Sequence, residues 1–112
     1  MGEAMTFDEY QRASARTINT TLSQTDQLAN AALGISGEAG EVAGLVKQAL
    51  FQEHQLNPIK VASEMGDVLW YLALLATTMG FSLGSVAEAN VKKLEARYPK
   101  GFRAADSVNR EA

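Results

Sequence analysis

The chain has 112 residues, the size of a single domain, and its formal net charge of −3 argues against a nonspecific nucleic-acid binder. It contains no cysteine, which excludes disulfides and thiolate metal sites and suits a reducing cytoplasm. Its start lacks the apolar core of a signal peptide, and its longest apolar run, 68–76, is about half of what a membrane span needs. We therefore expect one cytoplasmic domain over residues 1–112, with neither a membrane nor a nucleic-acid polymer as partner.

Two helix starts are visible in the first half of the chain. Thr6 followed by Glu9 is a capping box, so a first helix is expected over about 7–19. A polar stretch rich in Ser and Thr follows, and at its end Thr25 or the Asp after it is an N-cap candidate. A second helix is then expected over about 27–52.

The helix boundaries in the second half are marked by proline, glycine and serine. Asn57 before Pro58 gives an N-cap followed by proline at the first helical position, and Gly80 is a C-terminal stop. A third helix is expected between these signals. Ser82 is the N-cap of a fourth helix, which Pro99 ends.

Residues 103–112 are expected to form a frayed tail. No period-2 alternation of useful length occurs, so the fold class is all-α. The short connections favour a four-helix antiparallel bundle. The third helix is apolar almost all round after Asp67, and one small chain has difficulty covering such a helix, so we expect a homo-oligomer, either a homodimer or a homotetramer.

Two pairs of acidic residues, Glu38 with Glu41 and Glu64 with Asp67, each have a spacing of three. Helical residues three apart share a face, so each helix offers two carboxylates in one direction. Both pairs lie beside apolar or glycine-rich stretches, and four carboxylates cannot gather in a poorly solvated place unless a cation joins them or some become protonated. One pair alone is common on solvated surfaces, whereas the two together favour Mg²⁺, with Mn²⁺ as a substitute.

Glycines are frequent in the second helix, where Gly37, Gly40 and Gly44 recur at intervals of three and four. Glycine is unfavourable in a helix, so the helix either breaks here or leaves room beside the acids for a neighbouring backbone or a ligand. A di-iron centre is disfavoured because it needs Glu-x-x-His on two helices, whereas the only histidine, His54, has Phe51 three residues before it.

Three polar residues of the fourth helix, Asn90, Lys93 and Arg97, fall on one face. They form either a solvated basic face or a grip for phosphate oxygens. Tyr71 lies four residues after Asp67 and either stacks on a base or closes the core. Trp70 is expected to point away from the acids on the third helix, into the core or an interface.

The acids, Tyr71 and the polar residues of the fourth helix lie in three segments. These are 33–42 (Leu-Gly-Ile-Ser-Gly-Glu-Ala-Gly-Glu-Val), 64–72 (Glu-Met-Gly-Asp-Val-Leu-Trp-Tyr-Leu) and 90–102, which ends in Arg-Tyr-Pro-Lys-Gly-Phe. Together they resemble the MazG-like family of all-α nucleoside triphosphate pyrophosphohydrolases. The resemblance covers about residues 10–102.

The resemblance implies Mg²⁺-dependent hydrolysis of the α–β bond of a (d)NTP, giving a monophosphate and pyrophosphate. It implies metal binding by the four acids, phosphate contacts by Asn90 and Lys93, and a nucleotide contact by Tyr71. We expect Glu38 or Glu41 to orient or deprotonate the attacking water, and Lys93 and Arg97 to steady the polyphosphate. Two alternatives stay open: a phosphoribosyl-ATP pyrophosphohydrolase, and a helical oligomer that binds nucleotide or protein without catalysis.

Overall fold

The computed structural model describes residues 4–110, so the first three residues and the last two of the expected tail lie outside it. The described residues form five α-helices and one 3-10 helix, and the all-α prediction is confirmed. The elements are α1 (Phe7–Ser14), η1 (Ala15–Thr17), α2 (Gln24–Phe51), α3 (Pro58–Met79), α4 (Leu83–Arg97) and α5 (Ala104–Val108).

Most helix ends follow the capping signals. The Thr6 capping box, the Asn57 cap before Pro58 and the Ser82 cap are all present, and Gly80 ends α3 with a φ of 81°. The predicted start of α2 was wrong. Ser23 is the N-cap, because its side chain accepts the backbone N–H of Asp26, and α2 therefore begins earlier than expected.

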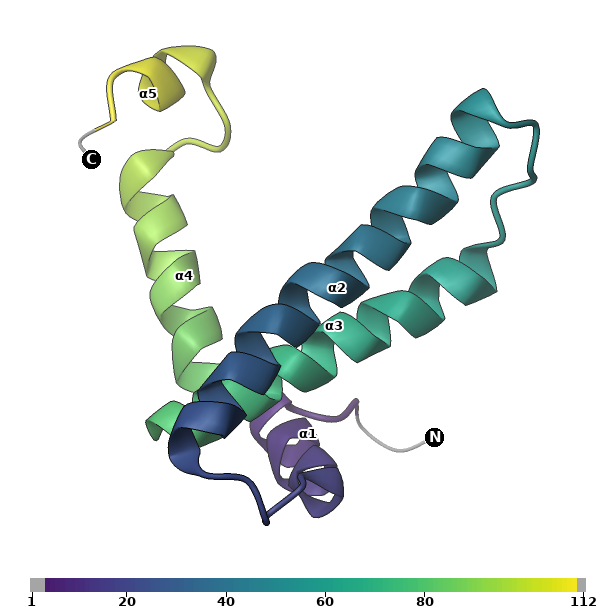
Figure 1. Ribbon diagram of the computed structural model, residues 1–112. Helices are drawn as coiled ribbons and strands as arrows, with labels where there is room; N and C mark the ends of the chain where they lie inside the picture. The colour runs from purple at the N-terminus through teal and green to yellow at the C-terminus, as the bar shows by residue number, and fades with distance from the viewer. Residues whose placement is uncertain (1–3, 111–112) are drawn as a thin grey trace.

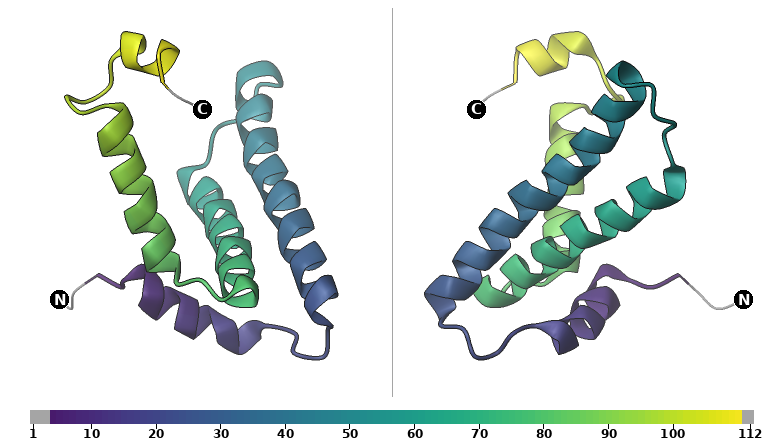
Figure 2. Two further views of the ribbon diagram at one scale, coloured as in Figure 1. Left: turned by 90° about the vertical axis from the view of Figure 1, so that its left-hand side faces the viewer. Right: turned by 45° about the vertical axis from the view of Figure 1, so that its right-hand side comes forward.

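The helices α2 and α3 run side by side in opposite directions, α1 lies across one end of this pair, and α4 leads away from it (Figures 1 and 2). The bend between α3 and α4 is 102°. The radius of gyration is 17.2 Å, against about 13 Å for a compact chain of this length. The prediction of a four-helix antiparallel bundle is therefore wrong for the single chain, because among residues 4–110 the antiparallel packing is limited to α2 and α3.

The direction of α4 is held by side chains of α1. Asp8 accepts hydrogen bonds from the Ser82 hydroxyl (2.7 Å) and from the Gly84 N–H (2.8 Å). The side chain of Gln11 accepts the Leu83 N–H at 2.6 Å and donates to the Phe81 carbonyl at 2.9 Å. These bonds satisfy polar groups that a helix end leaves unpaired, and they attach the start of α4 to α1 rather than to α2.

The core is small, and the described hydrophobic residues that are buried are Ala31, Ala73, Leu74, Ala76 and Leu83. Many large apolar side chains of α2 and α3 remain exposed. The segment expected to fray contains α5 instead. Within residues 4–110 no single helix is both long and apolar enough to cross a membrane, and α3 with α4 meets that length and composition only as a bent pair.

Candidate metal centre

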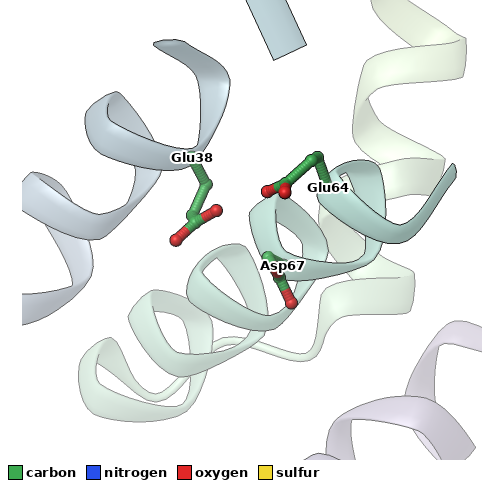
Figure 3. A group of neighbouring side chains, drawn as sticks. All are labelled: Glu38, Glu64 and Asp67. Atoms are coloured by element: carbon green, nitrogen blue, oxygen red, sulfur yellow. The ribbon is translucent and has the colours of Figure 1, made fainter. Parts of the chain in front are cut away.

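Three of the four predicted acids come together between α2 and α3. Glu38 extends from α2 toward Glu64 and Asp67, which lie one turn apart on α3 (Figure 3). One carboxylate oxygen from each lies within 4.8 Å of the other two. The antiparallel packing of the two helices brings these groups together, because each helix alone places its acids on one face but cannot orient that face.

The closeness of these carboxylates affects the protonation of Glu38. The pKa of Glu38 is raised above its usual value, chiefly through hydrogen bonding with Glu64 and then through loss of hydration. The negative charges of Asp67, Glu64 and Glu41 raise the same pKa further. A cation placed between the carboxylates would reverse each of these charge effects.

The donor set fits a hard divalent cation. Carboxylate oxygens are the ligands that Mg²⁺ and Mn²⁺ favour, and in an octahedral Mg²⁺ site adjacent ligands are about 3 Å apart and opposite ligands about 4.2 Å apart. The oxygens of Glu38, Glu64 and Asp67 lie within 4.8 Å of one another, so small side-chain rotations bring all three into range. Asp67 is exposed, which leaves the remaining positions of the cation to water or to phosphate oxygens.

Glu41, the fourth predicted acid, lies outside this triad of Glu38, Glu64 and Asp67. It is exposed on α2, one turn after Glu38. Its charge nevertheless contributes to the raised pKa of Glu38. Glu41 therefore lies close enough to influence the centre, but its carboxylate is not among the three that converge there.

A pocket of about 420 Å³ opens beside the triad, lined by Thr17, Glu38, Asp67, Trp70 and Tyr71. The prediction that Trp70 points away from the acids was wrong. Its indole N–H donates to the Thr17 hydroxyl at 2.8 Å, so η1 draws the ring to the acidic side of α3. Trp70 and Tyr71 meet edge to face with ring centres 5.0 Å apart.

Tyr71 both packs against α2 and lines the pocket. Its ring covers Gly34 so closely that a Cβ there would lie under 3.0 Å from it. At Gly37, Gly40 and Gly44, by contrast, a Cβ would meet nothing within 4 Å. Within the described residues no neighbouring backbone approaches these three glycines, so room for a ligand beside them stays a prediction. The alternative that the helix breaks here is wrong, because α2 is continuous through them.

Two residues of the first helical segment belong to this region and were missed by sequence reasoning. Tyr10 packs against the core of α3 and α4, and its pKa is raised by burial and by the negative charge of Asp67. Thr17 lines the pocket and holds Trp70. No spacing rule connects either residue to Asp67, because contacts across more than fifty positions of sequence depend on the packing of α1 and η1 against α3.

The predicted phosphate-binding residues lie elsewhere in the chain. Asn90, Lys93 and Arg97 are on α4, and none of them lines the pocket that contains Glu38 and Asp67. Figure 2 shows α4 separated from the α2–α3 pair in one of its views. A single chain thus presents the acids and these polar residues of α4 on different parts of its surface.

Comparison with known proteins identifies the family to which these residues belong. The MazG nucleotide pyrophosphohydrolase domain matches residues 26–102, which include all four acids and the whole of α4. The chain belongs to the MazG family. Gene 37 protein of Mycobacterium phage L5 is 37% identical to the MazG chain over 82 residues, covering 70% of this chain and 72% of the phage protein. No solved structure is significantly similar to this MazG chain.

Proposed function

We propose that this MazG-domain protein is a Mg²⁺-dependent nucleoside triphosphate pyrophosphohydrolase, which converts a (d)NTP and water into a (d)NMP and pyrophosphate. The observation that carries the proposal is the convergence of Glu38, Glu64 and Asp67 oxygens within 4.8 Å, inside the MazG match. The proposed role is removal of unwanted nucleotides in the cytoplasm, where Mg²⁺ and triphosphates occur together.

The acids have separate tasks in this proposal. Glu38, Glu64 and Asp67 hold Mg²⁺, which when bound neutralises phosphate charge and stabilises the transition state. Glu41 completes the acidic set from one turn along α2. Because its oxygens lie outside the gathered triad, Glu41 is the better placed of the two α2 acids to accept a proton from the attacking water, with Glu38 as the other candidate.

The remaining substrate contacts are proposed from their positions. Tyr71 and the adjoining pocket receive the nucleoside. Asn90, Lys93 and Arg97 bind the phosphates, and because they lie away from the acids of their own chain, α4 of a partner subunit supplies them.

The activity is tested by measuring pyrophosphate release from a panel of canonical and damaged (d)NTPs and phosphoribosyl-ATP, with Mg²⁺ and with EDTA. Turnover should require Mg²⁺. Loss of a group that only orients a metal ligand costs about 10–100-fold, so Glu38→Gln and Asp67→Asn should each lower turnover by at least about a hundredfold.

Glu95→Gln is the matched control, since Glu95 is an exposed acid of α4 outside the centre. It should retain the wild-type rate. Helical content from circular dichroism establishes that each variant is folded. Full turnover by folded Glu38→Gln would show that the metal centre is assigned to the wrong residues.

The chain is further proposed to work as a homo-oligomer, a dimer or a tetramer. An apolar pocket of about 480 Å³ on the α2–α3 pair offers a surface for a second copy, and it is lined by Ala39, Val42, Met65, Gly66, Val68, Leu69 and Leu72. Light scattering after size-exclusion chromatography should give a mass above that of one chain. Leu72→Glu should shift it toward the monomer, and a monomeric wild type that turns over substrate would refute this assembly.

A further inference from the structure

A third pocket, whose lining includes none of the triad acids, lies between α4 and α5. Its volume is about 430 Å³, within the roughly 300–1,000 Å³ typical of small-molecule sites. It is lined by Lys93, Ala96, Arg97, Asp106, Asn109 and Arg110. Three cationic side chains against one carboxylate leave an excess of two positive charges, and the only apolar lining residue is a small alanine.

The pocket exists because the chain turns back after α4. Tyr98 ends the helix, and the Gly101 N–H donates to the Tyr98 carbonyl at 3.2 Å. Gly101 has a φ of 79°, which side-chain-bearing residues rarely adopt, so glycine allows this turn. The rings of Tyr98 and Phe102 then pack 5.4 Å apart, and α5 returns toward the last turns of α4.

Half of the lining comes from a part of the chain that the family does not define. The MazG match ends at residue 102, whereas Asp106, Asn109 and Arg110 follow it. Lys93 and Arg97 alone would be a basic strip on one helix face, which is usually just solvated. Arg110 adds a third cation from the segment after α5, so the strip becomes one wall of an open pocket that is lined from two sides.

We propose that this pocket binds a diphosphate group, with Arg110 as the third cation beside Lys93 and Arg97. Arginine and lysine donors match phosphate oxygens, and two linked phosphates need several cations at once. The pocket has no aromatic or large apolar lining to hold a base, so the phosphates are the recognised part. The proposal rests on the hydrolase function for the source of the diphosphate, which is either free pyrophosphate or the β,γ end of a bound triphosphate.

The test is calorimetric titration of the full chain with inorganic pyrophosphate, in EDTA and at low salt. Wild-type protein should bind, and binding should weaken as salt is added, because exposed charges are screened. Arg110→Gln should weaken it about fivefold, the size expected for one exposed charge pair. Arg103→Gln, the same change in the same segment but outside the pocket, should leave it unaltered.

The variant Asp106→Asn distinguishes direct binding of pyrophosphate from a structural role of α5. Removing this carboxylate should tighten pyrophosphate binding, whereas a purely structural role of α5 would make Asp106→Asn and Arg110→Gln weaken it alike. Equal weakening by both variants, or no binding by the wild type, would overturn the proposal whether or not the protein hydrolyses nucleotides. If pyrophosphate binds as described and no triphosphate is turned over, only the hydrolase function fails.

Kinetics identify the source of the diphosphate. If the pocket holds the β,γ end of the substrate, Arg110→Gln raises KM. If it holds free pyrophosphate, Arg110→Gln weakens inhibition by added pyrophosphate and leaves KM unchanged.

Discussion

Alanine in place of Gly34 would put a methyl group against the ring of Tyr71. A Cβ at this position would lie closer than 3.0 Å to three atoms of that ring, so the ring or the helix must move. The ring itself meets Trp70 edge to face and lines the pocket beside Asp67, which limits the directions in which it can shift. The change therefore perturbs the contact between α2 and α3 where Gly34 meets the Tyr71 ring.

Two opposing terms set the size of the effect. Alanine is more favourable than glycine inside a helix by about 1 kcal/mol. Overpacking a filled contact costs about 1–3 kcal/mol. Gly34→Ala should thus lower the free energy of unfolding by about 0–2 kcal/mol. Gly37→Ala, where a Cβ would meet nothing within 4 Å, should raise it by up to about 1 kcal/mol.

Thermal melts followed by circular dichroism at one fixed protein concentration measure this difference. Each kcal/mol corresponds to about 4–8 °C in Tm for a domain of 60–100 residues, so the two variants should be clearly separated. In a Tyr71→Ala background the clash disappears, and Gly34→Ala should then stabilise. The reasoning is refuted if Gly34→Ala stabilises the wild-type protein as much as Gly37→Ala does.

Gln11→Ala removes the hydrogen bonds that attach α1 to the α3–α4 turn and should cost about 1–2 kcal/mol of stability in the same melts; an unchanged Tm would show that α4 is held by other contacts. Hydrogen bonds from the start of α4 lower the pKa of Asp8 from 3.8, so its stabilising effect is present above that pH and is lost as the pH falls through the lowered value. Acid unfolding of Asp8→Asn should accordingly converge with that of the wild type at the lowest pH and differ from it above about pH 4; parallel curves throughout would contradict this. The only tryptophan, Trp70, lines the pocket with Glu38, so paramagnetic Mn²⁺ should quench its fluorescence in the wild type and not in Glu38→Gln, and equal quenching in both would place the metal elsewhere.

The sequence by itself determined the local features of this protein. The caps at Thr6, Asn57 and Ser82 use atoms within three residues of the helix start, so they could be identified without any knowledge of packing. The same holds for the face shared by Glu64 and Asp67, because helical spacing fixes it. Ser23 shows the limit of this reasoning, since several adjacent Ser, Thr and Asp side chains could cap α2 and only one does.

Only the tertiary structure decided which of these faces meet. Glu38 joins Glu64 and Asp67 while Glu41 does not, because the approach of α2 to α3 selects among residues that the sequence treats alike. The direction of α4 depends on hydrogen bonds from Gln11 to residues about seventy positions away. Such bonds have no periodic signature, so the sequence indicated the acids, the cations and the helices that carry them, and the packing determined their separation.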